Sequence, residues 1–325
     1  LYRRRQRQMC IRDRLNKLTK FLGGINMLGF IKNLVGGLAL ISFTVVGGIA
    51  NSASCPKSGG ILKYGVKAEP PTYDMHGTNS YAVMHFVAQH YSTLLTFDWN
   101  KFPKLEGDVA DSWNVSSDGL TYTFKIKKGI KFHDGTPLTS KDVKATYDRL
   151  RNPPEGVISV RKALFSSISG ITTPDDNTVV FKLSSPDAFM LDGFASPFNA
   201  IYSAKDIAKD PKWHLKNING TGPYKFVAHK KGESWKAEKF ADFHHGDNCL
   251  DGTESFRIKK VAEPLIGGQI MAEWRGTAPP ERVLLKKEMG DNVSFQAKTL
   301  MTLWVVSLNS KTKACLLYTS PSPRD

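Results

Sequence analysis

The stretch from Asp118 to Leu150, DGLTYTFKIKKGIKFHDGTPLTSKDVKATYDRL, decides the local fold. Its first part alternates apolar and polar residues, which is typical of a strand with one buried face. The apolar positions are Leu120, Tyr122, Phe124 and Ile126, and we expect Ile130 and Phe132 to resume the strand. Asp118-Gly119 and Asp134-Gly135 are turn sequences, because glycine adopts positive φ at no steric cost.

A capped helix is predicted directly after the second turn. Thr139 can cap its first turn, and Asp142 stands three residues on, in the capping-box position. Val143, Tyr147 and Leu150 then follow at helical spacing. The stretch therefore predicts a hairpin-like strand, a turn and a helix, and none of its residues forms a reactive constellation.

The same stretch resembles the signature of the family 5 solute-binding proteins, which are the extracytoplasmic receptors of peptide- and nickel-type ABC importers. The resemblance rests on DGLTYTFK from Asp118, GIKFHDGTPLT from Gly129 and KDV from Lys141. A second family marker is GTGPY from Gly220, a tight turn that leads into a strand. The resemblance covers roughly residues 57–314. It implies an α/β fold like that of the periplasmic binding proteins, type II in the large three-subdomain form, with mixed sheets and flanking helices.

Family members are considerably longer and have two lobes, so the resemblance implies that this chain contains the first lobe only. We expect the main subdomain of that lobe at 57–84 and 186–300, and an accessory subdomain at 85–185. Residues 301–314 would begin the missing second lobe. Further expected elements are strands at 61–66, 179–183, 224–227, 256–258 and 303–307, a hairpin turn at 231–233, and a helical segment at 81–95. Residues 262–275 resemble the family's next segment.

The two ends of the chain do not match the family. Residues 1–26 and 315–325 include strings that resemble translated sequencing-adapter sequence, so we expect them to lie outside the natural fold; the alternative is a natural basic arm and tail. Residues 27–54 have the layout of a secretory signal peptide, with Lys32, an apolar run and small residues before Cys55. A membrane-spanning helix is the alternative for this run. Ser52-Ala53-Ser54-Cys55 also resembles a lipoprotein box, which would make Cys55 a lipid anchor.

The charge distribution does not favour a nucleic-acid partner. The 325 residues carry a formal net charge of +15, but residues 1–20 hold eight Lys or Arg against one Asp. About half of the excess therefore lies in the suspect leader, and the rest describes a mildly basic, solvated surface.

We found little reactive chemistry in the sequence. Cys10, Cys55, Cys249 and Cys315 have no paired spacing, so neither a zinc site nor a disulfide framework is indicated. His244 and His245, near Asp247 and Cys249, would point to opposite sides of an extended segment, which favours a solvated loop over a metal site. Asp134 beside His133 is explained as a turn residue. We therefore expect no enzyme activity, no cofactor and no metal.

The expected function is capture of a peptide or similar small polar solute and its delivery to an ABC permease in the membrane, by an exported, monomeric protein. The alternative is an extracytoplasmic sensor or chaperone that uses the same fold without transport. Motif position assigns candidate solute contacts to Glu69, Pro70, Pro71 and Thr72, after the first strand, and to Gly220, Thr221 and Gly222. A purely structural turn is the alternative for the second group. The charged partners of ligand termini would lie in the missing lobe, so the sequence identifies neither the solute nor the permease.

Overall fold

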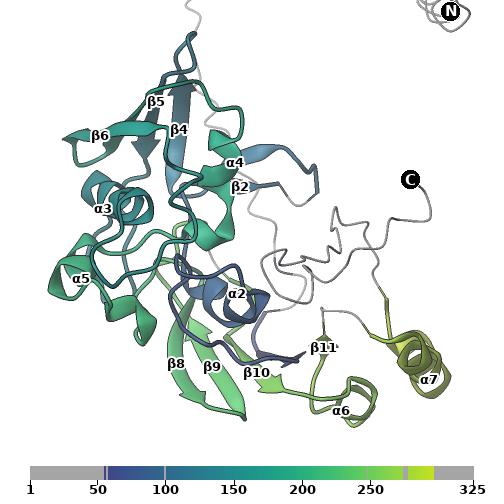
Figure 1. The fold of residues 1–325 in the computed structure, drawn as a ribbon. Coiled ribbons are helices and arrows are strands. Elements are labelled where there is room, and N and C mark those ends of the chain that lie inside the picture. The colour runs from purple at the N-terminus through teal and green to yellow at the C-terminus, as the bar shows by residue number, and fades with distance from the viewer. Residues whose placement is uncertain (1–54, 56–57, 99, 247, 274–276, 296–325) are drawn as a thin grey trace, which may run out of the picture. The chain divides into compact units, whose positions relative to one another are not determined.

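The computed structural model describes residue 55 and residues 58–98, 100–246, 248–273 and 277–295 (Figure 1). The expected leader at 1–26, the signal peptide at 27–54, the strand at 303–307 and the tail at 315–325 all lie outside these residues. Among the described residues, no helix combines the length and the apolar character that crossing a membrane requires.

A five-stranded sheet contains the first described strand near its centre. Its spatial order is β11-β1-β10-β9-β8. Strand β1 is parallel to both of its neighbours, β10 and β11, whereas β9 is antiparallel to both of its neighbours. The strands are β1 (Ile61–Val66), β8 (Tyr224–Lys230), β9 (Ser234–Lys239), β10 (Gly252–Arg257) and β11 (Ala272–Glu273). The expected strand at 61–66 and the hairpin turn at 231–233 are confirmed, and β10 begins earlier than expected.

A four-stranded antiparallel sheet contains the strand predicted after the Asp118-Gly119 turn. Its order is β4-β5-β7-β6, and its strands are β4 (Ala110–Val115), β5 (Thr121–Ile126), β6 (Ile168–Asp175) and β7 (Thr178–Leu183). Tyr122, Phe124 and Ile126 are buried on one face, as their alternation predicted. Ile130 and Phe132 are also buried, but they form no strand, because only an isolated bridge between Lys131 and Pro137 follows β5. A separate pair, β2 (Leu95–Phe97) with β3 (Leu105–Gly107), precedes this sheet.

The predicted capping box starts helix α3 (Ser140–Arg151). The Thr139 side chain accepts a hydrogen bond from the backbone N–H of Lys141, and the Asp142 carboxylate accepts one from the backbone N–H of Thr139 at 2.8 Å. Asp142 also accepts the backbone N–H of Ala204, at 2.8 Å, just before another helix. One carboxylate therefore caps α3 and fixes the start of α5.

The remaining helices are short, and one differs from its prediction. They are α2 (Tyr81–Val87), α4 (Met190–Ala195), α5 (Ala204–Lys209), α6 (Ala262–Ile266) and α7 (Pro279–Met289), with 3-10 turns at Ala88–His90, Pro197–Asn199, Trp213–Leu215 and Gly290–Asn292. The helix expected over 81–95 is wrong in length, because α2 ends at Val87 and its 3-10 extension at His90. The carbonyl of His90 accepts the N–H of Gly222, and Tyr91 is extended.

Two main hydrophobic cores lie under the two sheets. In the first, Phe124, Phe181 and Tyr147 pack around Phe194 of α4, with ring centroids 4.8–5.2 Å from that of Phe194. The second surrounds Trp235 of β9 and includes residues of both β1 and α2. The sheets fall within the expected subdomain ranges, although α2 crosses position 84 and Phe194 lies beyond 185. The expected boundaries therefore stay a prediction.

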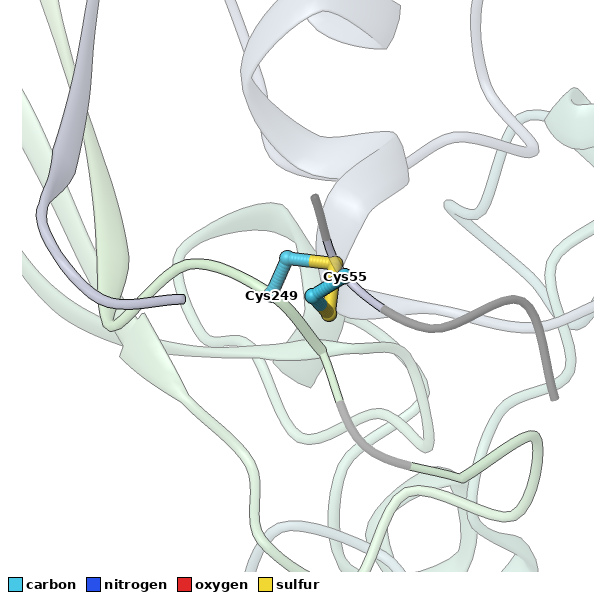
Figure 2. Close-up of a disulfide and its surroundings, with 2 residues drawn as sticks. All are labelled: Cys55 and Cys249. Atoms are coloured by element: carbon cyan, nitrogen blue, oxygen red, sulfur yellow. A yellow bond between two sulfur atoms is a disulfide. The ribbon is translucent and has the colours of Figure 1, made fainter. Parts of the chain in front are cut away.

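A disulfide joins Cys55 to Cys249 (Figure 2), across a sequence separation of 194 residues. The expectation that the cysteines form no disulfide is wrong. Because β1 and β10 are parallel, the segments that precede them, with Cys55 and Cys249, lie at the same end of the sheet. The N–H of Gly59 also donates to the carbonyl of Cys249 at 2.7 Å. A sulfur in this bond cannot carry a lipid thioether. Closing so long a loop stabilises the fold by about 5 kcal/mol in the chain-entropy account.

Removal of the Asp142 carboxylate tests its role at the starts of both α3 and α5. We expect Asp142→Ala to lower the free energy of unfolding by about 2–4 kcal/mol, because two backbone donors lose their acceptor. Thr139→Ala should cost about 1 kcal/mol, as for a simple cap. Lys141→Ala is the exposed control, with an effect within about 0.5 kcal/mol. Urea unfolding measures all three, and equal losses for Asp142→Ala and Thr139→Ala would contradict the double role.

Candidate functional site

The segment after β1 contains the first group of predicted solute contacts. Pro70 is buried, Glu69 and Thr72 are partly buried, and Pro71 is exposed. The Glu69 carboxylate is 2.9 Å from Nε2 of His229 on β8. Glu69 and Thr72 thus present polar atoms shortly after the end of β1. The strand cannot continue through Pro70 and Pro71, because proline has no backbone N–H for the sheet.

A short relay fixes the position of Glu69. Nδ1 of His229 is 2.8 Å from the hydroxyl of Tyr73, and the Tyr73 ring packs edge-on against Trp235 at 5.1 Å. When His229 donates from Nε2 to Glu69, its Nδ1 accepts from Tyr73, and both ring nitrogens are satisfied. Burial, together with the nearby charge of Glu69, raises the pKa of Tyr73, which keeps its hydroxyl a donor.

The second predicted group, Gly220 to Gly222, lies in a buried turn. Thr221 has no exposed surface. A Cβ at Gly220 would lie 1.9 Å from the carbonyl oxygen of His90, and one at Gly222 would lie 2.5 Å from the N–H nitrogen of Tyr91. Only glycine allows this backbone approach. The structure therefore explains the GTGPY marker first as a packing requirement; a direct solute contact by these residues stays a prediction.

Two histidines, buried His90 and partly buried His133, hold this turn. His133 donates its backbone N–H to the carbonyl of Gly220 at 2.8 Å, and its Nε2 is 2.9 Å from the carbonyl of Gly222. His90 contacts the carbonyl of Tyr224 through Nδ1 at 2.7 Å and accepts the indole N–H of Trp235 at Nε2. Burial lowers the pKa of His90 to about 3 and that of His133 to about 4, so both are neutral at pH 7. His133, in the sequence HDG, thus connects the segment after β5 to the turn before β8.

A buried ion pair forms a second connection. The guanidinium of Arg149 on α3 contacts the carboxylate of Asp74 at 2.7 and 3.3 Å, and both side chains are 1% exposed. The hydroxyl of Tyr202 donates to the same carboxylate at 3.1 Å. Burial alone would raise the pKa of Asp74, but Arg149 and the hydrogen bonds outweigh it and the pKa is lowered. Asp74 therefore stays ionised at neutral pH.

His76 completes this network as a neutral acceptor. Its Nδ1 is 2.9 Å from a guanidinium nitrogen of Arg149, and its Nε2 is 2.8 Å from the carbonyl of Ala200. Arginine only donates, so Nδ1 accepts and Nε2 carries the proton. Burial lowers the pKa of His76 to about 3, in agreement with this tautomer.

The structure overturns the interpretation of His244 and His245 as divergent side chains. Both Nε2 atoms are 2.9 Å from the same Oδ1 atom of Asp108. Their segment is a series of turns, closed by the Gly246 N–H bond to the carbonyl of Phe243, so the alternation of an extended chain does not apply. Cys249 is occupied by the disulfide, and Asp247 lies outside the described residues. Asp108, which follows β3, was the member that sequence reasoning missed, 136 residues away.

A hollow of about 900 Å³ lies beside this cluster, away from Glu69. It opens to solvent between the turns at 125–129 and 175–178, and Asp111 and His244 also line it. Its lining includes three lysines and three aspartates, and none of the predicted solute contacts lines it.

The sequence and the fold were then compared with known proteins. Residues 104–314 match the model of the family described as bacterial extracellular solute-binding proteins, family 5 middle. A protein of Brucella ovis described as an ABC transporter peptide-binding protein is 36% identical over 204 residues, which are 60% of this chain and 38% of that protein. The glutathione-binding protein of Pectobacterium atrosepticum is 37% identical over 147 residues, 45% of this chain and 28% of that protein. The chain thus spans well under half the length of these relatives.

Two solved structures with a similar fold contain bound peptides. The periplasmic binding protein DppA from Helicobacter pylori, in complex with the peptide STSA, has a TM-score of 0.65 and 27% identity, over 71% of this chain and 49% of that one. The oligopeptide-binding protein AppA from Bacillus subtilis, in complex with a nonapeptide, has a TM-score of 0.65 and 26% identity, over 72% and 47%.

Breaking the buried pair tests its structural weight. We expect Arg149→Met to lower the free energy of unfolding by about 3–5 kcal/mol, because Asp74 is left charged and buried. Adding Asp74→Asn should recover part of that loss. Lys144→Ala removes the exposed Lys144–Asp148 pair of the same helix and should cost about 0.5 kcal/mol. Denaturant unfolding gives all values; a double variant less stable than Arg149→Met would refute the charge argument.

The buried histidines predict a pH dependence of stability. The pKa of histidine in the unfolded chain is about 6.5. Below this pH, His76, His90 and His133 bind protons in the unfolded chain but not in the folded protein. Stability should be constant above pH 7 and fall as the pH drops from 6.5 toward 4, by up to about 1.4 kcal/mol per pH unit for each histidine. Urea midpoints between pH 8 and 5 measure this. His90→Gln should flatten the slope, and a midpoint that does not change across the range would contradict the neutral assignments.

Proposed function

The chain belongs to the bacterial extracellular solute-binding proteins of family 5, with their α/β fold, and from this premise we propose that its parent protein is the substrate-binding subunit of an ABC importer. That subunit captures a peptide or a similar small polar solute outside the cytoplasm and delivers it to a membrane permease. The family match over residues 104–314 carries the proposal. The names of the relatives and the bound peptides of the solved structures support peptides as the solute class.

We propose that the described residues supply one wall of the binding cleft. The chain aligns with 47–49% of the two solved peptide complexes, so the opposite wall and its charged contacts belong to the rest of such a protein. A solute receptor of this type needs directed polar groups and a closing hinge, and no reactive group. A peptide can be held through its backbone, much like an added strand.

Glu69 is the residue that we assign first to solute binding. Its carboxylate accepts hydrogen bonds, and His229 with Tyr73 holds it at the end of β1. Such an acceptor suits a backbone N–H or an amino group of a peptide. The Gly220–Gly222 turn then has a packing role, through its close contacts with residues 89–91.

Calorimetry on the full-length parent protein tests the proposal. We expect saturable binding from a panel of di-, tetra- and nonapeptides and glutathione, and a loss of about fivefold or more in affinity for Glu69→Gln, because a charge-assisted hydrogen bond is replaced by a neutral one. Glu233→Gln is the matched control, since this exposed acid pairs only with neighbouring Lys230 among its described ion-pair partners.

Two outcomes would count against this assignment. A parent protein that binds no member of the panel would refute the solute class. Submicromolar binding by residues 57–314 alone would refute the single-wall proposal, because one wall cannot enclose a ligand.

A further inference from the structure

Three side chains that could bind a metal ion lie close together, although they come from distant parts of the sequence. Asp108 lies between β3 and β4, and His244 and His245 lie in the loop between β9 and β10. One donor atom of each residue lies within 4.8 Å of the other two. Two imidazole nitrogens and one carboxylate oxygen are a donor set that suits Zn²⁺ and its borderline neighbours, and not the hard ions Mg²⁺ or Ca²⁺.

Two of the three donor–donor distances are close to those around a bound ion. With Zn–N and Zn–O bonds of about 2.0–2.1 Å in a tetrahedral site, neighbouring donors stand about 3.3 Å apart. The present 2.9 Å contacts from Oδ1 of Asp108 to the two Nε2 atoms need to open by only a few tenths of an ångström. The other carboxylate oxygen accepts the backbone N–H of Thr93 at 2.7 Å, so the carboxylate is oriented independently of the histidines.

The loop that bears the histidines is fixed and reachable. The disulfide at Cys249 anchors it on its C-terminal side. The Lys131–Asp242 ion pair, at 3.0 Å, is exposed and contributes little to its position. The side chain of His245 is 38% exposed, and His244 borders the open hollow. A fourth ligand position can therefore be filled by water. Two features limit the affinity: the positive charge of Lys127 acts on His244, and Nδ1 of His244 has no hydrogen-bond partner among the described residues.

We propose that Asp108, His244 and His245 form a binding site for a divalent transition metal ion of the Zn²⁺ class, separate from the solute-binding wall. The ion replaces the shared hydrogen bonds to Asp108 and connects the loop after β9 to the segment before β4. The site does not depend on the proposed transport function.

Zinc titration of the complete, oxidised chain tests this proposal. Free thiols are first alkylated without reduction, so that Cys10 and Cys315 do not contribute. We expect isothermal titration with Zn²⁺ to show one saturable site that a tenfold excess of Mg²⁺ leaves unchanged. His245→Ala should weaken it about tenfold or more while the protein stays folded, because the exposed ring carries little packing. Substitution with Co²⁺ should give the visible absorption of a nitrogen- and oxygen-ligated ion.

The control is Asp242→Asn, which removes an exposed acid from the same loop and leaves all three donors. Asp108→Asn has only one acceptor oxygen for Thr93 and the two histidines, so it is interpreted only if its circular dichroism matches that of the starting protein. Absence of a saturable Zn²⁺ site, equal affinity in His245→Ala, or equal losses in His245→Ala and Asp242→Asn would overturn the proposal.

Discussion

The guanidinium of Arg149 and the carboxylate of Asp74 face one another out of contact with water, and the two cores of the fold are connected through them. Arg149 belongs to α3, which packs on the four-stranded sheet. Asp74 comes after β1 of the five-stranded sheet. Taking both charges out of water costs several kcal/mol for each ion, which only close mutual geometry and further hydrogen bonds offset. Tyr202 and His76 supply those bonds. The pair therefore acts less as a source of stability than as a requirement for one relative position of α3 and β1.

The Gly220–Gly222 turn imposes a second requirement of the same kind. Its carbonyls are used by His133, and its close approach to residues 89–91 leaves no room for a side chain. A family marker of this sort is easily taken for a ligand contact, because glycine turns also bring backbone close to ligands. In this chain the close neighbour is the protein itself. The polar atoms of Glu69, by contrast, lie at the end of β1, with a fixed orientation and partial exposure.

Local features were predictable from the sequence, and contacts between distant segments were not. Alternation predicted β5 and β7, and the Thr139–Asp142 capping box predicted the start of α3, because each depends on residues within a few positions. The length of α2 depends on Gly222, which is more than a hundred positions away. The same holds for the candidate site. Nothing near Cys55 identifies Cys249 as its partner, and nothing near the histidine pair identifies Asp108 as its acceptor. The disulfide becomes visible only once parallel β1 and β10 bring the segments that precede them to the same end of the sheet. The contact of Asp108 with the histidine pair becomes visible only once the loop after β9 lies beside the segment before β4.

The position of β1 has a consequence for the order of events during synthesis. Ile61 pairs with Gly252, and β11, the other neighbour of β1, begins at Ala272. A ribosome adds about 5–20 residues per second, so the first strand leaves it roughly 10–40 seconds before its partners exist. During that interval β1 is an unpaired strand with apolar residues, the kind of segment on which chains aggregate. The four-stranded sheet, complete by Leu183, can fold in the meantime. Strand β1 therefore stays open to aggregation until β10 and β11, the last described strands, have been synthesised and can pair with it.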